Sequence, residues 1–230
     1  MYRAGPPTLG ARLLAAAGQV RRGRTVADIG CDHGKLAVWL ALRGGAPGVI
    51  AVDSRPMPLA RAAALVRRTG CAQRVQLRLG NGLAALAPGE AEDIVIAGLS
   101  GETIVDLLAA CAWAKDEKLH FVLVPTTHPE RLRRWLCEAG FEIGREVPVL
   151  EKGRAYTVMS VGYTGAATTP APLFCQLGRI AEQRGPAAAA YTAARLAHLE
   201  KEARAPRPPK ETAAHRRLIQ EVASCLQSMQ

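Results

Sequence analysis

Short apolar runs alternate with helix-like stretches along residues 25–165, and this alternation limits the possible folds more than any other feature. Strands that alternate with helices of this length predict a mainly parallel sheet with helices on both faces, an α/β fold. A short turn separates the last two runs, which suits an antiparallel hairpin. The expected strands are residues 25–29, 49–52, 75–79, 93–97, 119–124, 141–149 and 156–161. The expected helices are residues 36–43, 58–69, 102–114 and 129–139.

The rest of the chain has a different pattern. Residues 165–172 are rich in Gly, Ala, Thr and Pro and predict a linker. Beyond them, apolar residues recur at helical spacing and no strand pattern occurs. We expect two main helices that fold back on each other, with a kink or interruption at Gly185-Pro186 and a break within residues 204–209. The predicted division is a domain of residues 1–165 and a C-terminal helical domain of residues 166–230.

Composition narrows the class of protein. Apolar residues make up 49% of the 230 residues, but no apolar run approaches the roughly 18 residues that a membrane-spanning helix needs. The apolar stretch at residues 13–17 is too short for the core of a signal peptide, so we expect a cytoplasmic protein without a membrane partner. Six cysteines occur without a Cys-x-x-Cys pair or a Cys/His cluster at zinc spacing. We therefore expect reduced thiols and no metal.

The net charge of +10 comes from 30 Lys and Arg residues against 20 Asp and Glu residues. A polyanion such as nucleic acid is a reasonable partner for this charge, because each neutralised phosphate releases condensed counterions. Many basic proteins bind no nucleic acid, so charge alone leaves both interpretations open.

The most informative stretch is residues 26–35, Val-Ala-Asp-Ile-Gly-Cys-Asp-His-Gly-Lys, which joins the first strand to the first helix. Glycine here lets the backbone approach a ligand, and the spacing of Gly30 and Gly34 differs from the G-x-G-x-x-G of nicotinamide-binding loops. Asp32 would repel a pyrophosphate but can accept hydrogen bonds from a ribose or a cationic amino acid. The loop therefore favours S-adenosylmethionine over a nicotinamide cofactor.

Two further strand ends carry polar residues suited to a nucleoside. Asp53 ends the second strand, where a carboxylate can accept hydrogen bonds from both ribose hydroxyls. Asn81 and Gly82 follow the third strand, where an adenine ring would lie. A solvated strand-end Asp and an ordinary Asn-Gly turn are the alternative interpretations. Three strand ends in register predict one site at the carboxyl edge of the sheet.

Three motifs resemble the bacterial TrmK family, the tRNA (adenine(22)-N1)-methyltransferases that use S-adenosylmethionine. They are Ala-Asp-Ile-Gly-Cys-Asp-His at residues 27–33, Gly-Asn-Gly-Leu at 80–83 and Ala-Gly-Leu-Ser-Gly at 97–101. The resemblance extends from about residue 9 to Tyr156. It implies a Rossmann-like, seven-stranded class I methyltransferase sheet with a C-terminal coiled-coil-like helical appendage. It also implies methyl transfer to N1 of an adenine in tRNA.

The chain departs from the family pattern at positions that concern the target base. Leu99 and Ser100 stand where the family has Met-Gly, and Ser100 adds a side chain where a base needs clearance. Thr126 stands where the family has Asn after Pro, so it offers a hydroxyl in place of an amide. Asn81 replaces an acidic residue but can still accept a hydrogen bond. These differences bear on the target base more than on the cofactor.

We therefore expect three groups of functional residues. The residues expected to hold the cofactor are Asp28, Gly30, Cys31, Asp32, His33, Asp53, Asn81 and Gly82. The residues expected on the side of the target base are Gly98, Ser100, Pro125, Thr126 and Tyr156. The arginines expected to contact RNA are Arg12, Arg24, Arg131, Arg133 and Arg134.

Three functions stay open at this point. The first is tRNA adenine N1-methylation, in which the enzyme mainly has to align N1 with the methyl group. The second is methylation of another RNA or of a small molecule, since fold and cofactor do not fix the substrate. The third is RNA binding without catalysis on a methyltransferase scaffold, which the departures at Ser100 and Thr126 make conceivable.

Overall fold

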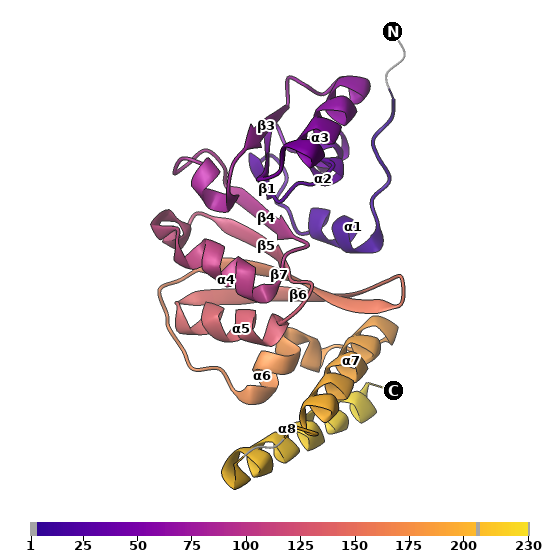
Figure 1. The fold of residues 1–230 in the computed structure, drawn as a ribbon, viewed down its shortest axis with the longest axis vertical. Coiled ribbons are helices and arrows are strands. Elements are labelled where there is room, and N and C mark those ends of the chain that lie inside the picture. Colours follow the sequence, from indigo (N-terminus) through magenta and orange to yellow (C-terminus); the bar gives the residue numbers. More distant parts are fainter. Residues whose placement is uncertain (1–3, 206–207, 230) are drawn as a thin grey trace.

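The computed structural model describes residues 4–205 and 208–229 and contains one seven-stranded sheet (Figure 1). The strand order is β3-β2-β1-β4-β5-β7-β6, and the number of strands is that of the predicted methyltransferase sheet. The strands are β1 (Val26–Ile29), β2 (Val49–Asp53), β3 (Val75–Leu79), β4 (Asp93–Ala97), β5 (His120–Val124), β6 (Phe141–Glu151) and β7 (Arg154–Tyr163).

The first five strands are parallel, and β7 pairs antiparallel with both β5 and β6. The chain moves outward from β1 to β2 and β3, then returns to place β4 on the other side of β1. Such a reversal opens a crevice at the carboxyl ends of the strands, where open α/β sheets bind their ligands. The predicted motifs lie at this edge.

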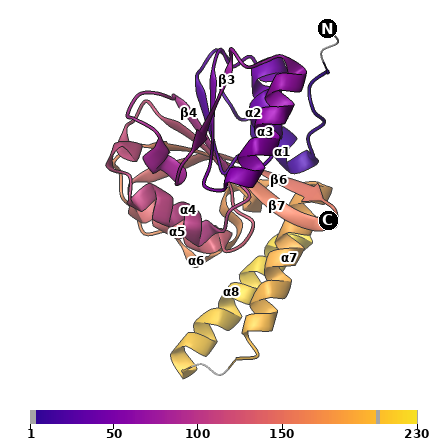
Figure 2. The same cartoon turned by 45° about the horizontal axis from the view of Figure 1, so that its top comes forward.

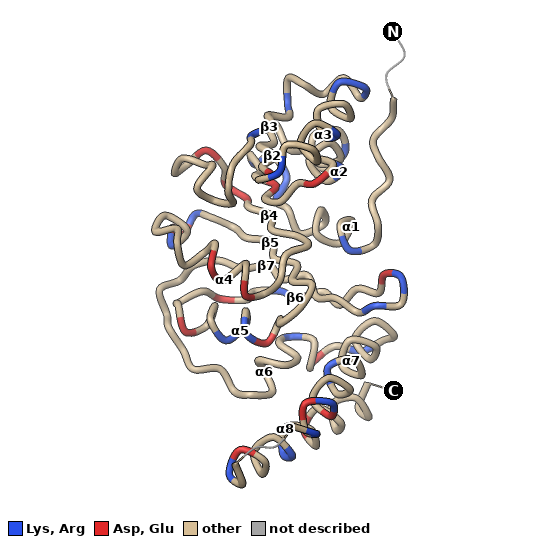
Figure 3. The backbone as a smooth tube through the Cα atoms, in the orientation of Figure 1, with Lys and Arg blue, Asp and Glu red and all other residues tan. Residues whose placement is uncertain are grey.

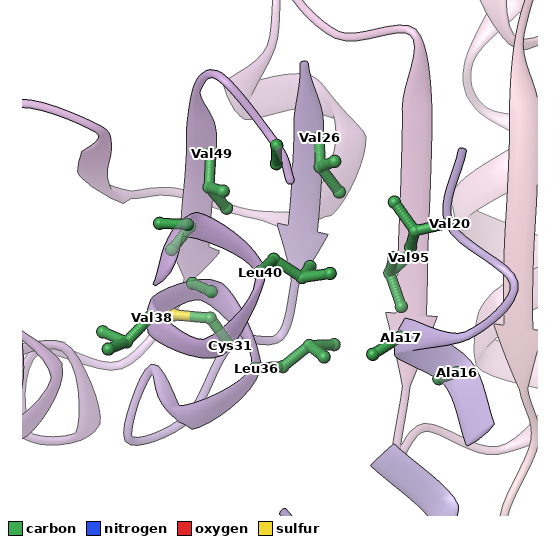
Figure 4. Packing of buried hydrophobic residues seen from close by; sticks show 14 of the residues in the cluster. Ala16, Ala17, Val20, Val26, Cys31, Leu36, Val38, Leu40, Val49 and Val95 are labelled. Carbon is green, nitrogen blue, oxygen red and sulfur yellow. The ribbon is translucent and has the colours of Figure 1, made fainter. Parts of the chain in front are cut away.

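Helices cover both faces of the sheet (Figure 2). Alternate residues of each buried strand point to opposite faces, so each face has an apolar core of its own. On one face, Leu36 and Leu40 pack beside Val26 and Val95 (Figure 4). The helices on that face are α1 (Ala11–Ala17), α2 (Lys35–Trp39) with its π-helical extension Leu40–Gly44, and α3 (Pro56–Thr69). Those on the other are α4 (Gly101–Ala109) and α5 (Pro129–Glu138), with 3-10 turns at Gly82–Ala85 and Ala112–Lys115.

The C-terminal region is helical and packs against the sheet domain through α5 and β6. It contains α6 (Pro172–Leu177), a 3-10 turn (Gly178–Glu182), α7 (Pro186–Glu202) and α8 (Pro209–Ser228). Helices α7 and α8 run antiparallel (Figures 1 and 2), as the sequence predicts, around a small core of their own. Pro186 begins α7, so Gly185-Pro186 is an interruption, not a kink.

The boundary expected at residue 165 falls in the connection between the end of β7 at Tyr163 and the start of α6 at Pro172. The division into two domains stays a prediction. The expected helix break within residues 204–209 lies between the end of α7 and the start of α8, with residues 206 and 207 outside the described part.

Candidate functional site

A cavity of about 930 Å³ opens at the carboxyl edge of β1, β2, β3 and β4. Each of the residues predicted to hold the cofactor lines it, although they come from three separate stretches of sequence. Contact between each of them and a cofactor stays a prediction. The predicted cofactor residues in the wall are Asp28, Gly30, Cys31, Asp32, His33, Asp53, Asn81 and Gly82.

The loop after β1 is fixed by backbone contacts. The backbone N–H groups of Gly30 and Cys31 both donate to Val52 O at 2.9 Å, which ties the loop to β2. A Cβ on Gly34 would lie 2.8 Å from Ala62 Cβ, so glycine there allows α3 to pack closely. Gly30 has a φ of +73°, and a Cβ there would meet only Leu99 Cδ2 at 3.9 Å. The space above Gly30 is therefore open to a ligand.

Asp53 links the loop to the end of β2. Its carboxylate is 3% exposed, and its Oδ2 accepts a hydrogen bond from the Asp32 backbone N–H at 2.9 Å. Its Oδ1 accepts one from the Arg55 backbone N–H at 2.9 Å. Oδ1 also accepts a longer hydrogen bond from Arg55 Nε at 3.4 Å, whereas Oδ2 has a further acceptor site. Asp53 can thus hold the loop in place and still accept hydrogen bonds from ribose hydroxyls.

Asp28 differs from Asp53 because only one of its carboxylate oxygens has a partner among the described residues. It is 3% exposed, and its Oδ2 is buried without a hydrogen bond to any described residue. Burial raises the pKa of Asp28 to about 7. A backbone hydrogen bond from Ala37 lowers this pKa in part, and the negative charge of the nearby Asp53 raises it. A buried carboxylate oxygen that faces a cavity without a partner suits a cationic group of a ligand. This observation fits the ammonium group of S-adenosylmethionine.

Arg12 lies in the wall of the same cavity, on α1. Its guanidinium carbon is 5.3 Å from the centroid of the Tyr156 ring, and its Nε is 3.6 Å from Glu151 Oε2. The Nε and one terminal nitrogen are buried and make no hydrogen bond to a described residue. Arg12 therefore presents donors at the cavity, and its predicted contact with RNA stays a prediction.

The residues predicted on the base side separate into two groups. Gly98 lines the first cavity, while Pro125, Thr126 and Tyr156 line a second cavity of about 360 Å³. Ser100 is not among the described residues that line either cavity. Its Oγ caps α4 by accepting a hydrogen bond from the Thr103 backbone N–H at 3.0 Å. The Ser100 side chain therefore has a structural role at the start of α4, and its expected place beside the base stays a prediction.

Two of the arginines predicted to contact RNA, Arg133 and Arg24, lie away from the surface groove and the cavities. Arg133 is completely buried, with its guanidinium 2.9 Å from Glu146, and so cannot contact RNA in this structure. The run of arginines in the sequence gave no sign that one of them points inward. Arg24 pairs with Glu92 at the amino edge of the sheet, away from the cavities.

Arg131 and Arg134 remain available to a partner. Arg131 is exposed and pairs with Glu102, and both arginines line a surface groove along α5, α6 and α8. Lys and Arg also occur at the turn between β6 and β7 and along α7 and α8 (Figure 3). The basic charge is thus distributed over both parts of the molecule.

Several residues at the two cavities were not expected from the sequence. Leu107 on α4 and Lys152 in the β6–β7 turn line the first cavity, and Arg195 and His198 on α7 line the second. The amphipathic pattern of α4 offered a signal for Leu107. No local pattern places a hairpin turn or a C-terminal helix beside the loop of a distant strand.

The family model for a methyltransferase domain matches residues 9–159. The chain belongs to this family. The tRNA (adenine(22)-N(1))-methyltransferase of Bacillus subtilis is 32% identical over 151 residues, which cover 66% of this chain and 63% of that protein. The match thus spans a little under two thirds of the curated relative.

Solved structures resemble the whole chain, the C-terminal helices included. Sp1610 of Streptococcus pneumoniae, a candidate tRNA (m1A22) methyltransferase, has a TM-score of 0.83 at 26% identity, covering 95% of this chain and 100% of that one. The B. subtilis m1A22 tRNA methyltransferase TrmK has a TM-score of 0.78 at 25% identity, covering 96% and 98%. Sp1610 has also been crystallised with S-adenosyl-L-methionine. These matches confirm the predicted methyltransferase fold and the resemblance to the TrmK family.

Two further features concern partners. No helix in residues 4–205 and 208–229 is long and apolar enough to cross a membrane. Within the same described ranges, no group of three or more His, Cys, Asp or Glu side chains is arranged to hold a metal ion.

Proposed function

We propose that this chain binds S-adenosylmethionine in the first cavity and transfers its methyl group to N1 of an adenine in tRNA. The target would be the adenine numbered 22 in the names of its relatives. The observation that carries the proposal is the convergence of three strand ends on one cavity, with the buried, partnerless Asp28 Oδ2 in its wall. The relatives that are described as m1A22 methyltransferases support the choice of substrate.

The cofactor would be held by groups at the three strand ends. Asp53 would accept hydrogen bonds from the ribose hydroxyls, and Asn81 would contact the adenine ring. Asp28 would face the ammonium group, whose positive charge favours the ionised carboxylate. When bound, S-adenosylmethionine supplies an electrophilic methyl carbon on a positively charged sulfur.

The chain's own task in the reaction is alignment. Adenine N1 has an in-plane lone pair, so it needs little help from a general base, and positioning supplies most of the rate enhancement. N1 lies on the Watson–Crick edge, so the nucleotide must leave its stack at a cost of a few kcal/mol. Gly98, Thr126 and Tyr156 border the space in which the base would be held. Exposed arginines that bind the surrounding backbone would offset the cost of unstacking.

The two alternative functions make different predictions. A small-molecule methyltransferase would bind S-adenosylmethionine but would show no salt-dependent affinity for RNA. An RNA-binding protein without catalysis would bind tRNA and transfer no methyl group. The proposed function also implies a cytoplasmic location, because the tRNA substrate would be found there.

The proposal is tested by incubating labelled S-adenosylmethionine with the protein and, separately, unmodified tRNA transcripts, ribosomal RNA fragments and free nucleosides. We expect label in tRNA alone, and label confined to another class would contradict the proposal. Asp53→Ala is the site variant, with the exposed Glu117→Ala as its control. Loss of the charged acceptor should weaken cofactor binding about 50-fold in calorimetric titration. Unchanged affinity in Asp53→Ala would place the cofactor elsewhere.

A further inference from the structure

The second cavity is formed jointly by the sheet domain and the C-terminal helices. Its wall includes the loop after β5, with Pro125 and Thr126, and the beginning of β7, with Tyr156. The remaining side is α7, which contributes Ala194 and His198. Its volume of about 360 Å³ lies within the range of small-molecule pockets. A pocket between two domains is a common place for a substrate.

Lining residues of the two cavities contact one another. On one side, the Thr126 backbone N–H and hydroxyl both donate to Leu99 O, at 2.9 and 3.0 Å, and Leu99 lines the first cavity. On the other side, the Arg12 guanidinium stacks on the Tyr156 ring. The two cavities are therefore adjacent, and a base in the second would lie beside the methyl donor in the first.

Helix α7 presents one face to the second cavity. Tyr191, Ala194, Arg195 and His198 follow the i, i+3, i+4, i+7 spacing of a single helix face. Two of the four are buried and the other two are accessible from the cavity. Ala194 is exposed and the His198 side chain is 38% exposed, so these two can contact a ligand.

The buried pair on this face fixes α7 to the sheet domain. Arg195 lies 2.9 Å from Glu130 at the start of α5 and donates to the side chain of Gln176. The Tyr191 hydroxyl accepts a hydrogen bond from Arg133 at 2.8 Å. These contacts are buried or half-buried, so Ala194 and His198 are held at a set distance from the loop after β5.

We propose that the second cavity receives the acceptor nucleotide and that α7 completes this pocket, with His198 in contact with the base. This inference rests on the proposed function, because the first cavity must hold the methyl donor. The chemistry of the wall suits a nucleobase: the Tyr156 ring and Pro125 offer flat apolar surfaces, and the Thr126 and His198 side chains offer polar groups at the ring edge. The C-terminal helices would thus take part in recognising the base as well as in binding RNA.

The test fills the cavity from α7. Ala194→Leu adds three carbons inside the cavity, and Ala197→Leu adds the same group on an exposed part of α7 outside it. We expect Ala194→Leu to lower kcat/KM for tRNA about 100-fold because the acceptor is misplaced, with calorimetric affinity for S-adenosylmethionine unchanged. Ala197→Leu should behave as the wild type. His198→Ala should lower kcat/KM, and His198→Gln should restore part of the loss.

A binding measurement distinguishes recognition of the acceptor base from contacts with the neighbouring nucleotides. The wild type should bind tRNA with adenine at the target position more tightly than tRNA that is abasic there, and Ala194→Leu should lose this preference. Full activity of Ala194→Leu, or an intact preference, would overturn the inference while leaving the proposed function standing. Absence of methyl transfer by the wild-type protein would instead overturn the proposed function and the inference with it.

Discussion

Asp28 and Asp53 show how residues of one type differ by environment. Both are 3% exposed at the same edge of the sheet. The Asp53 carboxylate accepts two backbone hydrogen bonds, whereas one oxygen of Asp28 has no partner among the described residues. An ionised carboxylate that lacks partners in the free protein is costly, and a cationic ligand removes that cost. Asp28 thus favours ligand binding at the expense of stability.

The first prediction concerns Asp28→Asn. In the folded protein the pKa of Asp28 is about 7, above its ordinary value of 3.8, so the folded state holds the proton more tightly than the unfolded state. Stability should therefore fall as pH rises from about 4 to about 7. Asparagine removes this dependence and should make the protein more stable at pH 8, by on the order of 3 kcal/mol. Below pH 4 the difference should vanish.

Thermal unfolding across this pH range measures the effect, and calorimetry measures cofactor affinity. Asp28→Asn should bind S-adenosylmethionine at least about tenfold more weakly, because it lacks the negative charge. A variant that is less stable than the wild type at pH 8, or that binds the cofactor equally well, would contradict the role given to Asp28.

Residue identity alone could predict the polar wall of the first cavity, because each of its predicted residues ends a strand or belongs to the loop after one. It could not predict the environment of Arg133. Ser100 is the N-cap of α4, a role that serine often has. Arg133 points into the protein and pairs with Glu146, which lies on the later strand β6. The Ser100 cap joins residues only three apart, but the partners of Arg133 lie on elements that local sequence does not bring together.

At the scale of elements, close packing at the start of α4 shapes the base side of the site. The Gly101 backbone N–H donates to Thr127 O at 2.8 Å. A Cβ on Gly101 would lie 2.3 Å from the carbonyl oxygen of His128, a backbone atom that cannot move alone. The α4 N-terminus and the loop before α5 therefore form one packed unit beside Thr126.

The second prediction is that Gly101→Ala destabilises the protein. Alanine is ordinarily about 1 kcal/mol better than glycine within a helix, but the clash at His128 should outweigh this gain and cost on the order of 2 kcal/mol net. Gly162→Ala is the matched control, because nothing lies within 4 Å of its Cβ position. Urea unfolding compares the two. Equal stability of both variants would show that the loop before α5 moves to accommodate the alanine at little cost in free energy.

The strands and the main helices could be predicted because their periodicity is local. Helix α1 could not, since its N-cap is Gly10 and the side chain that approaches its start is Glu151, from the distant β6–β7 hairpin. A Cβ on Gly10 would lie 2.0 Å from Glu151 Oε1, so the glycine makes room for that carboxylate. Such a contact between distant parts of the chain leaves no periodic signal.

At the scale of the whole molecule, the buried side chain of Arg133 joins the two parts of the chain. Arg133 on α5 pairs with Glu146 on β6 and donates to the carbonyl oxygens of Cys175 and Gln176, at 2.9 and 2.8 Å. It also donates to Tyr191 on α7. One side chain thus connects the sheet domain to α6 and α7, so we expect the helical region to keep a fixed orientation relative to the cavities.

The third prediction compares two adjacent arginines. Arg133→Ala leaves the buried carboxylate of Glu146 without its charged partner and should cost about 3–5 kcal/mol of unfolding free energy. Arg134→Ala, at an exposed position, should change stability by less than about 0.5 kcal/mol. If Arg134 contacts a phosphate, its loss should lower the salt dependence of tRNA binding by about one unit of slope. Similar stabilities of the two variants in denaturant would refute the structural role of Arg133.

The most direct test of the proposed methyl transfer is the identity of the methylated product. The wild-type protein, S-adenosylmethionine and an unmodified tRNA are incubated, and the digested nucleosides are separated and identified by mass spectrometry. We predict 1-methyladenosine, absent when adenine 22 is replaced by another base. Another methylated nucleoside, or 1-methyladenosine that persists after this replacement, would contradict the account.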